Sequence, residues 1–190
     1  MTPIEFLEAR RSVPARQLGE PAPTAAQVER LIAAAIRVPD HGKMTPWRLL
    51  TIRGDARARL GEQFAAIHQR SDPATPDAVL AKDRDRFNFA PLIFAVVARV
   101  QPNPKVPDQE QVLSAGYVAY NLLLAAQALG FGAQILTGWA AYDRDVAALL
   151  GLADHERVVA FVHVGTAHEA APERNRPTAA DVVSEWNPRA

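Results

Sequence analysis

The residue types best suited to chemistry gather in one stretch, residues 36–47, which reads Ile-Arg-Val-Pro-Asp-His-Gly-Lys-Met-Thr-Pro-Trp. It carries the guanidinium of Arg37, the imidazole of His41 and the ammonium of Lys43, and its two prolines restrict the backbone. Gly42 allows that backbone to pass close to a flat or crowded group. The stretch is therefore a candidate ligand-binding loop, the alternative being an ordinary connection whose charges are solvated.

A second group of polar side chains, Arg10-Arg11-Ser12, follows the first expected helix. Two guanidiniums beside a hydroxyl can make charge-assisted hydrogen bonds to a phosphate. Basic residues at a helix end can equally be solvated and complement the helix dipole. On residue types alone, the motif is a candidate phosphate site with this second interpretation beside it.

Composition argues against several other kinds of site. The chain of 190 residues has no cysteine, which rules out disulfides, thiol nucleophiles and thiolate metal sites. His163 lies in an apolar run with His168 five residues later, a pattern more typical of a core histidine than of metal ligands, so no metal is expected. Twenty-one basic and twenty-one acidic residues give no net charge, which argues against a nucleic-acid or anionic-membrane partner. Small molecules or a second copy of the chain are the expected partners.

The hydrophobic pattern predicts the elements that must position these groups. Apolar residues at helix spacing, opened by a capping box at Thr24 and Gln27, place a helix directly before the loop at 36–47. Short β-rich apolar runs predict buried strands, one of them directly after that loop. The expected helices are 2–9, 25–36, 55–68, 112–129 and 143–150. The expected strands are 47–52, 92–98 and 158–164, and residues 133–139 are expected to form a strand or an extended loop. In the first helix we expect Ile4, Phe6 and Leu7 to face inward.

The tract from Val112 to Leu129 is the longest apolar segment. Ser114, Asn121 and Gln127 interrupt it, which favours a buried helix of a water-soluble protein over a membrane span. One domain of this size rarely covers such a helix fully, so a partner subunit is the expected cover. The N-terminus lacks the continuous apolar stretch of a secretory signal, and we expect a cytoplasmic protein.

Together the motifs resemble the FMN-dependent nitroreductase family, in particular its small, short-chain members. The pattern Pro-Asp-His-x-x-Met-x-Pro-Trp at 39–47 is similar to the family's flavin-side loop, and Arg10-Arg11-Ser12 is similar to its N-terminal FMN-phosphate motif. Other similarities follow in the family's order: Lys105-Val106-Pro107, Glu110 leading into Ser114-Ala115-Gly116, Gly130-Phe131-Gly132 and Gly165-Thr166. The roles of Lys105 and Glu110 stay open.

The resemblance implies a single domain over residues 1–190 with a nitroreductase-like three-layer α+β fold. A mixed central sheet would be flanked by helices, in an intertwined homodimer with FMN at the subunit interface. The motif at 10–12 would bind the phosphate and ribityl region, the loop at 36–47 would reach the flavin from the opposing subunit, and a C-terminal cation would reach the phosphate. The cofactor-binding residues implied in this way are Arg10, Arg11, Ser12, Arg37, His41, Ile135, Leu136, Thr137 and Arg176.

Two positions leave that assignment open in detail. Many relatives carry another cation two residues after the serine, where this chain has Pro14, and Arg16 is its next cation. At the other end of the chain, Arg174 is the alternative to Arg176.

The activity implied by the resemblance is transfer of hydride from NAD(P)H through FMN to a nitroaromatic, quinone-like or other conjugated small-molecule acceptor. No catalytic protein residue is expected, because flavin N5 carries the chemistry. A flavin-fragmenting or dehalogenating enzyme of the same superfold and a non-catalytic flavin-binding module are the alternatives. The physiological acceptor and the choice between NADH and NADPH stay open.

Overall fold

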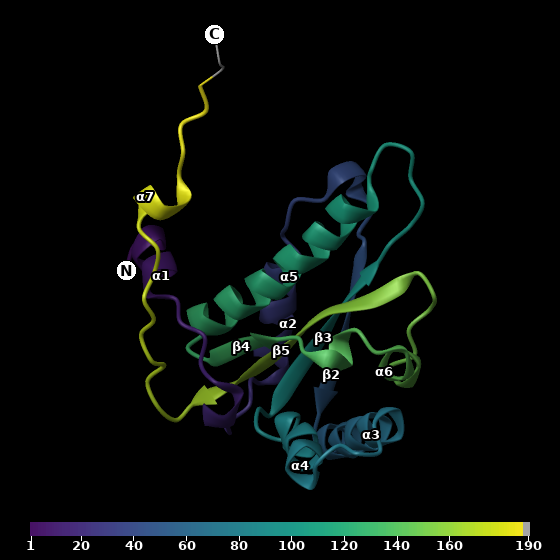
Figure 1. Ribbon diagram of the computed structural model, residues 1–190. Coiled ribbons are helices and arrows are strands. Elements are labelled where there is room, and N and C mark those ends of the chain that lie inside the picture. Colours follow the sequence, from purple (N-terminus) through teal and green to yellow (C-terminus); the bar gives the residue numbers. More distant parts are fainter. Residues whose placement is uncertain (188–190) are drawn as a thin grey trace.

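The computed structural model describes residues 1–187 and places a five-stranded sheet between two layers of helices (Figure 1). The strands are β1 (Leu18–Gly19), β2 (Trp47–Arg53), β3 (Leu92–Arg99), β4 (Gly132–Leu136) and β5 (Glu156–Ala167). The helices are α1 (Pro3–Ala9), α2 (Ala25–Ala35), α3 (Asp55–Ser71), α4 (Asp77–Arg86), α5 (Asp108–Ala128), α6 (Arg144–Leu149) and α7 (Ala179–Val182). This confirms the α+β class and the expected elements.

The sheet has the order β1-β5-β3-β2, and β4 pairs with β5 outside this path. Each of these four pairings is antiparallel, so the described sheet differs in this detail from the mixed sheet that we expected. The connection between β2 and β3 gives one reason. Helices α3 and α4 lie in this connection and bring the chain back to the end of the sheet where β2 finished, so β3 runs in the opposite direction. A parallel neighbour would begin at the other end and would need a crossover connection.

The central strand β3 separates two hydrophobic cores because its side chains alternate between the faces of the sheet. Phe94 and Val96 pack with α2 and α5 on one face. Ile93 and Ala95 pack with α3 and α6 on the other face. The continuous apolar run at 92–98 thus predicted a strand covered on both sides, and this is confirmed.

Helix α5 is the longest helix and crosses one face of the sheet obliquely (Figure 1). Val118 and Leu122 are fully buried against the sheet, whereas Leu113, Tyr117 and Tyr120 are between 44% and 47% exposed. Within residues 1–187 no helix, α5 included, is both long enough and apolar enough to cross a membrane. The exposed apolar side chains follow helix spacing and form a stripe, which we call the α5 stripe.

Helix α1 corrects one expectation. Ile4 is 61% and Leu7 47% exposed, and Phe6 is only partly buried, so these side chains do not face inward in this chain. The helix lies at the edge of the molecule beside the C-terminal segment and not over the sheet (Figure 1).

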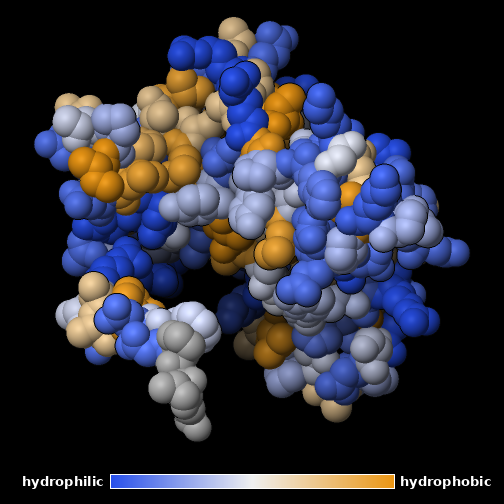
Figure 2. All heavy atoms as spheres, turned by 90° about the horizontal axis from the view of Figure 1, so that it is seen from above, coloured by the Kyte–Doolittle hydropathy of each residue, from blue (hydrophilic) through white to orange (hydrophobic). Residues whose placement is uncertain are grey.

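Viewed from above, hydrophobic side chains gather at the surface in a contiguous group on one side of the molecule (Figure 2).

Candidate functional site

Polar side chains on α5 anchor the loop at 36–47. Ser114 Oγ donates a hydrogen bond of 2.9 Å to the carbonyl oxygen of Pro39. About two helical turns further along α5, Asn121 Nδ2 donates a hydrogen bond of 3.2 Å to the carbonyl oxygen of Arg37. The residues that interrupt the apolar tract therefore fix the backbone of the candidate ligand loop to the longest helix.

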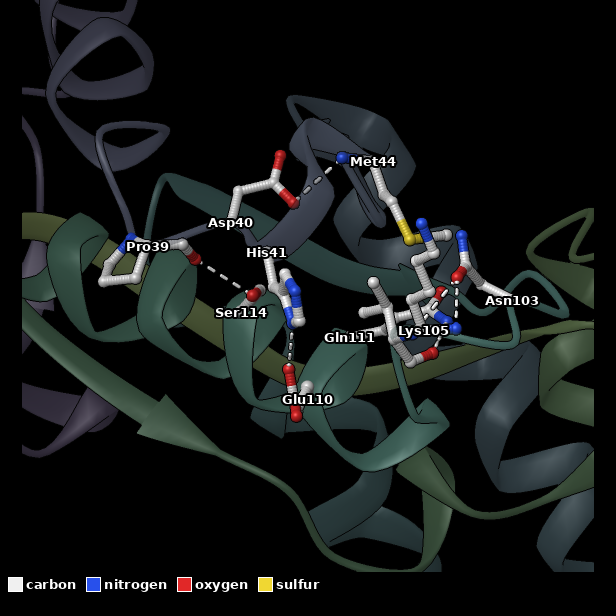
Figure 3. A network of polar contacts seen from close by, with 10 residues as sticks. Pro39, Asp40, His41, Met44, Asn103, Lys105, Glu110, Gln111 and Ser114 are labelled. Carbon is white, nitrogen blue, oxygen red and sulfur yellow. Dashed lines mark hydrogen bonds and ion pairs between the residues drawn. The ribbon is translucent and has the colours of Figure 1, made fainter.

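The loop is also braced internally. Asp40 accepts a hydrogen bond of 3.0 Å from the backbone N–H of Met44 (Figure 3). It also accepts one of 2.9 Å from the N–H of Thr45, and the two bonds close the turn. Gly42 has a φ of +73°, and a Cβ at this position would lie 3.4 Å from Val106 Cγ2. The loop therefore favours glycine at this position for its backbone conformation, whereas a Cβ would make only an ordinary contact with Val106.

That neighbouring loop, residues 101–106, is fixed by Gln111 of α5. Gln111 is 1% exposed, accepts from the N–H of Gln101 and donates to the carbonyl oxygens of Gln101 and Val106. Asn103 Oδ1 accepts from the N–H groups of Lys105 and Val106 and closes the turn between them (Figure 3). Lys105 itself is exposed at the tip of this support.

His41 is the loop side chain with a charged partner. Its Nδ1 lies 2.7 Å from Glu110 Oε2 in the first turn of α5 (Figure 3). Arg37 is exposed, and its backbone rather than its guanidinium carries the contact with α5. Glu110 had no role predicted from the sequence, and in the structure it is the partner of His41.

The motif at 10–12 lies at the other end of α5. Arg10 Nη1 donates to Ser12 Oγ at 3.3 Å, and Gln127 near the C-terminal end of α5 donates to the carbonyl oxygen of Arg11. The guanidinium of Arg11 is hydrogen-bonded to the carboxylate of Glu173 in the C-terminal segment. The motif thus already holds an anion from its own chain.

The environment of Glu173 shows which cations face this point. The pKa of Glu173 is lowered by the N–H of Arg174, which donates to its carboxylate, and further by the positive charges of Arg11 and Arg176. Arg176 therefore acts on the charge of Glu173, the same carboxylate that pairs with Arg11.

A cavity of about 640 Å³ adjoins the segment that follows this motif. Ala15 N–H donates to Gln134 Oε1 of β4 at 2.6 Å, and Val13 N–H donates to the carbonyl oxygen of Ala133 at 3.0 Å. The segment therefore runs along β4 and forms one rim, while α4 forms the opposite wall. The cavity is lined by Pro14, Ala15, Arg16, Ala78, Ala81, Lys82, Asp85, Arg86, Phe89, Gln134 and Leu136.

The residues expected at 135–137 are distributed around β4 by strand alternation. Leu136 lies in the cavity wall. Ile135 packs into the core beneath α5, so that only its backbone can face a ligand in the cavity. Thr137 is exposed directly after the strand.

The charge cluster Lys82-Asp83-Arg84-Asp85-Arg86 lies on α4, and its mixed signs by themselves predict a solvated face, which holds only in part. Lys82 and Arg86 line the cavity, and they were missed as site residues. Asp83 is 5% exposed, accepts from Trp139 Nε1 at 3.1 Å and lies 2.6 Å from His68 Nδ1. The contacts of Asp83 tie α4 to the segment after β4 and to α3, which holds the α4 wall of the cavity in place. The spacing of Lys82 and Arg86, four residues apart on one helix face, was the available signal.

His163 is fully buried below this region, as expected for a core histidine. Neither of its ring nitrogens has a hydrogen-bond partner in the described part of the chain. Burial, and in second place the charge of Arg86, lower the pKa of His163 to about 4, so its imidazole is neutral near pH 7. Residues 1–187 contain no group of three or more His, Cys, Asp or Glu side chains placed to hold a metal ion.

A second cavity, of about 680 Å³, lies between the N-terminal part of α5, α6 and the start of β5. Leu113, Tyr142 and Val159 are among the side chains that line it. None of the site residues predicted from sequence belongs to this lining, so we do not assign it to the same site.

Within one chain the predicted residues form two groups that are far apart. Glu110, which contacts His41, and Gln127, which contacts Arg11, are 17 residues apart on α5, or about 26 Å along the helix axis. Asn121 and Gln127 point to sides of the helix that differ by about 120°. The motif at 10–12, β4 and Arg176 thus form one group, and Arg37 and His41 form another.

The model of the Nitroreductase family matches residues 7–166. A protein of Escherichia coli K12 named "Putative NAD(P)H nitroreductase YdjA" is 36% identical over 168 residues, which cover 87% of this chain and 88% of that protein.

Solved structures give the same result for the fold. The nitroreductase-like family protein from Bacillus cereus superposes with a TM-score of 0.82 at 20% identity, covering 98% of this chain and 96% of the other. A structure from Desulfovibrio desulfuricans, described as a nitroreductase in complex with FMN, gives 0.76 at 21% identity over 99% of both chains. These similarities confirm the three-layer α+β fold predicted from sequence.

Proposed function

The chain belongs to the nitroreductase family, and on this basis we propose that it is an FMN-dependent oxidoreductase. It takes hydride from NAD(P)H and passes the electrons to a nitroaromatic, quinone-like or other conjugated acceptor. The name of the Escherichia coli relative supports the nicotinamide donor, and the FMN in the Desulfovibrio desulfuricans structure supports the cofactor.

The observation that carries this proposal is the anion-binding motif at 10–12, directly after which residues Pro14, Ala15 and Arg16 line a cavity of suitable size. Arg11 already binds a carboxylate, and Arg10 and Ser12 lie beside it, a donor set that suits one phosphate. The adjoining cavity of about 640 Å³ is within the range of small-molecule and cofactor sites. FMN is favoured over FAD because the sequence has one such basic motif and no Gly-x-Gly-x-x-Gly fingerprint for an adenosine dinucleotide.

Bound FMN would supply the N5 atom that accepts and donates hydride. The chain's own residues bind and orient it. Arg10, Arg11 and Ser12 hold the phosphate, and Leu136 gives the ring an apolar wall that excludes water. Lys82 and Arg86 bring positive charge into the cavity, which favours a ligand that becomes more negative on reduction.

We further propose that the site is shared between two chains of a homodimer. Arg37 and His41 cannot reach the cavity of their own chain, because α5 holds them at its other end and on another side. The α5 stripe lies between the two groups and offers an apolar surface for a second copy. A two-fold axis through this surface would bring the loop of each chain to the motif at 10–12 of the other. A cytoplasmic location, where NAD(P)H is supplied, is part of the proposal.

The test is to identify the cofactor and measure its reduction. We expect the purified protein to release FMN, identified by mass, and to lose its flavin absorbance within milliseconds to seconds on anaerobic mixing with NADH or NADPH. Riboflavin, which lacks the phosphate, should bind at least about tenfold more weakly than FMN, because the charge-assisted contacts are lost.

Three results would contradict the proposal. FAD in the protein would contradict the single-phosphate site. Equal binding of riboflavin and FMN would contradict the role of the motif at 10–12. Bound FMN that neither NADH nor NADPH reduces would favour the non-catalytic module.

A further inference from the structure

Glu110 contacts His41 of the ligand loop, and the proposed function gives this contact no role. We propose that Glu110 is the positioning residue for His41: it determines which ring nitrogen carries the proton and directs the other nitrogen, Nε2, toward the flavin of the partner subunit. The inference rests on the proposed function, because that function gives His41 its ligand.

The geometry brings the two side chains together from separate elements. His41 begins the 3₁₀ turn His41–Lys43, and Glu110 lies in the first turn of α5. The two side chains point toward one another, with Nδ1 and Oε2 2.7 Å apart (Figure 3). The backbone is fixed on both sides of His41. Before it, Ser114 binds the carbonyl oxygen of Pro39, and after it, the N–H groups of Met44 and Thr45 bind the carboxylate of Asp40. The backbone at His41 is therefore held in place, and what remains free is the rotation of its side chain.

The chemistry of the pair sets that rotation. An ionised carboxylate only accepts hydrogen bonds, so the nitrogen facing Glu110 must be the donor, Nδ1–H. The hydrogen bond at one ring nitrogen fixes the tautomer of a histidine. In a neutral ring, Nε2 is then left with its lone pair. Within residues 1–187 no hydrogen-bond partner of Nε2 is found, so this atom is available to a ligand.

The ordinary explanation is that Glu110 serves the stability of the fold. The side chains of His41 and Glu110 are 58% and 47% exposed, and exposed ion pairs contribute little to stability. A carboxylate in the first turn of a helix also complements the helix dipole, but Asp108 stands in the same turn. Asp108→Asn is therefore a matched control, since it removes a charge from that turn without touching the contact to His41.

The first experiment uses flavin-free protein. Nitrogen NMR of histidine-labelled wild-type protein near pH 7.5 should show the neutral ring of His41 with its proton on Nδ1. Glu110→Ala should lose this preference, whereas Asp108→Asn should keep it. A wild-type ring that carries its proton on Nε2, or a Glu110→Ala spectrum that matches the wild type, would overturn the inference.

The second experiment measures FMN affinity by fluorescence titration. Glu110→Ala should bind FMN about threefold to tenfold more weakly, because the ring of His41 is then no longer oriented to make its hydrogen bond through Nε2. Glu110→Gln should recover much of this loss because its amide oxygen still accepts from Nδ1–H, and Asp108→Asn should match the wild type. The thermal midpoints of all four flavin-free proteins should agree, which a purely structural role of Glu110 would not allow.

The outcomes separate this inference from the function on which it rests. If the wild type binds FMN and Glu110→Ala binds it equally well, the inference is wrong and the function stands. If the wild type does not bind FMN, the proposed function fails and takes the inference with it.

Discussion

Arg11 shows at the scale of single residues how the site can be tuned, because it binds an anion from its own chain. The carboxylate of Glu173 occupies the guanidinium that we assign to the FMN phosphate. A phosphate must displace this carboxylate or repel it. Glu173 is exposed, so the competing ion pair is weak.

We therefore expect Glu173→Gln to strengthen FMN binding by about twofold to fivefold, through the loss of this competition. A titration of flavin-free protein at low salt measures it. Glu169→Gln is the matched control, because Glu169 lies in the same segment and, among residues 1–187, its carboxylate bonds to the side chain of Gln17 and not to the motif at 10–12. Unchanged or weaker binding by Glu173→Gln would contradict the assignment of Arg11 to the phosphate.

His163 carries a prediction about stability and pH. Its pKa is about 4 in the folded chain and ordinarily about 6.5, so the unfolded chain takes up the proton first as the pH falls. The contribution of a neutral His163 to the free energy of unfolding is therefore complete above pH 6.5, and it is lost as the pH falls from 6.5 to 4. The loss amounts to at most about 3 kcal/mol, since each pKa unit corresponds to about 1.4 kcal/mol.

Urea unfolding of the flavin-free protein from pH 7 to 4 tests this prediction. His163→Leu should lose less stability than the wild type over this range, because its side chain takes up no proton. His155→Leu, at an exposed position, should follow the wild-type curve. Parallel curves for wild type and His163→Leu would show that the imidazole is not held neutral by burial.

At the scale of elements, α5 shows what a sequence pattern can and cannot reveal. The apolar periodicity predicted the helix at 112–129, and the observed helix is Asp108–Ala128. The same pattern presented Ser114, Asn121 and Gln127 only as interruptions. Their partners lie 75, 84 and 116 residues away in the chain, and such separations leave no periodic signal.

Helices α1 and α4 show two further limits for a related reason. The apolar residues of α1 predicted an inward face, but nothing local in the sequence says whether a helix packs on its own sheet or at an edge. The mixed charges of α4 predicted a solvated face, yet Asp83 is buried because Trp139 and His68 supply its hydrogen bonds from other elements. Local pattern therefore predicted the elements well, and tertiary partners decided which polar residues belong to the site.

The α5 stripe is the element on which the proposed dimer depends. Tyr120→Glu should give a monomer that retains little FMN, because it places a charge in the proposed apolar contact. Sedimentation velocity and flavin absorbance measure the two effects. Leu149→Glu on α6 is the control, since Leu149 is 42% exposed and lies outside the stripe. A Tyr120→Glu protein that remains dimeric, or a monomer that keeps its FMN, would contradict the proposed interface.

For the whole molecule, α5 separates two half-sites. One end of the helix holds the loop with Arg37 and His41, and the other end holds the motif at 10–12 beside the cavity. A rigid helix keeps them about 26 Å apart along its axis. The central claim is that two copies of the chain complete each other's site.

Mixing two defective chains tests this claim most directly. In a heterodimer of an Arg10→Ala chain and a His41→Ala chain, shared sites place both lesions in one site and none in the other. Purified heterodimers, separated by two affinity tags, should therefore show about half of the wild-type activity and bind about one FMN tightly, while both mutant homodimers stay impaired. If each loop serves its own chain, every site carries one lesion, and the heterodimer would show no recovery above the homodimers. That result would contradict the shared site.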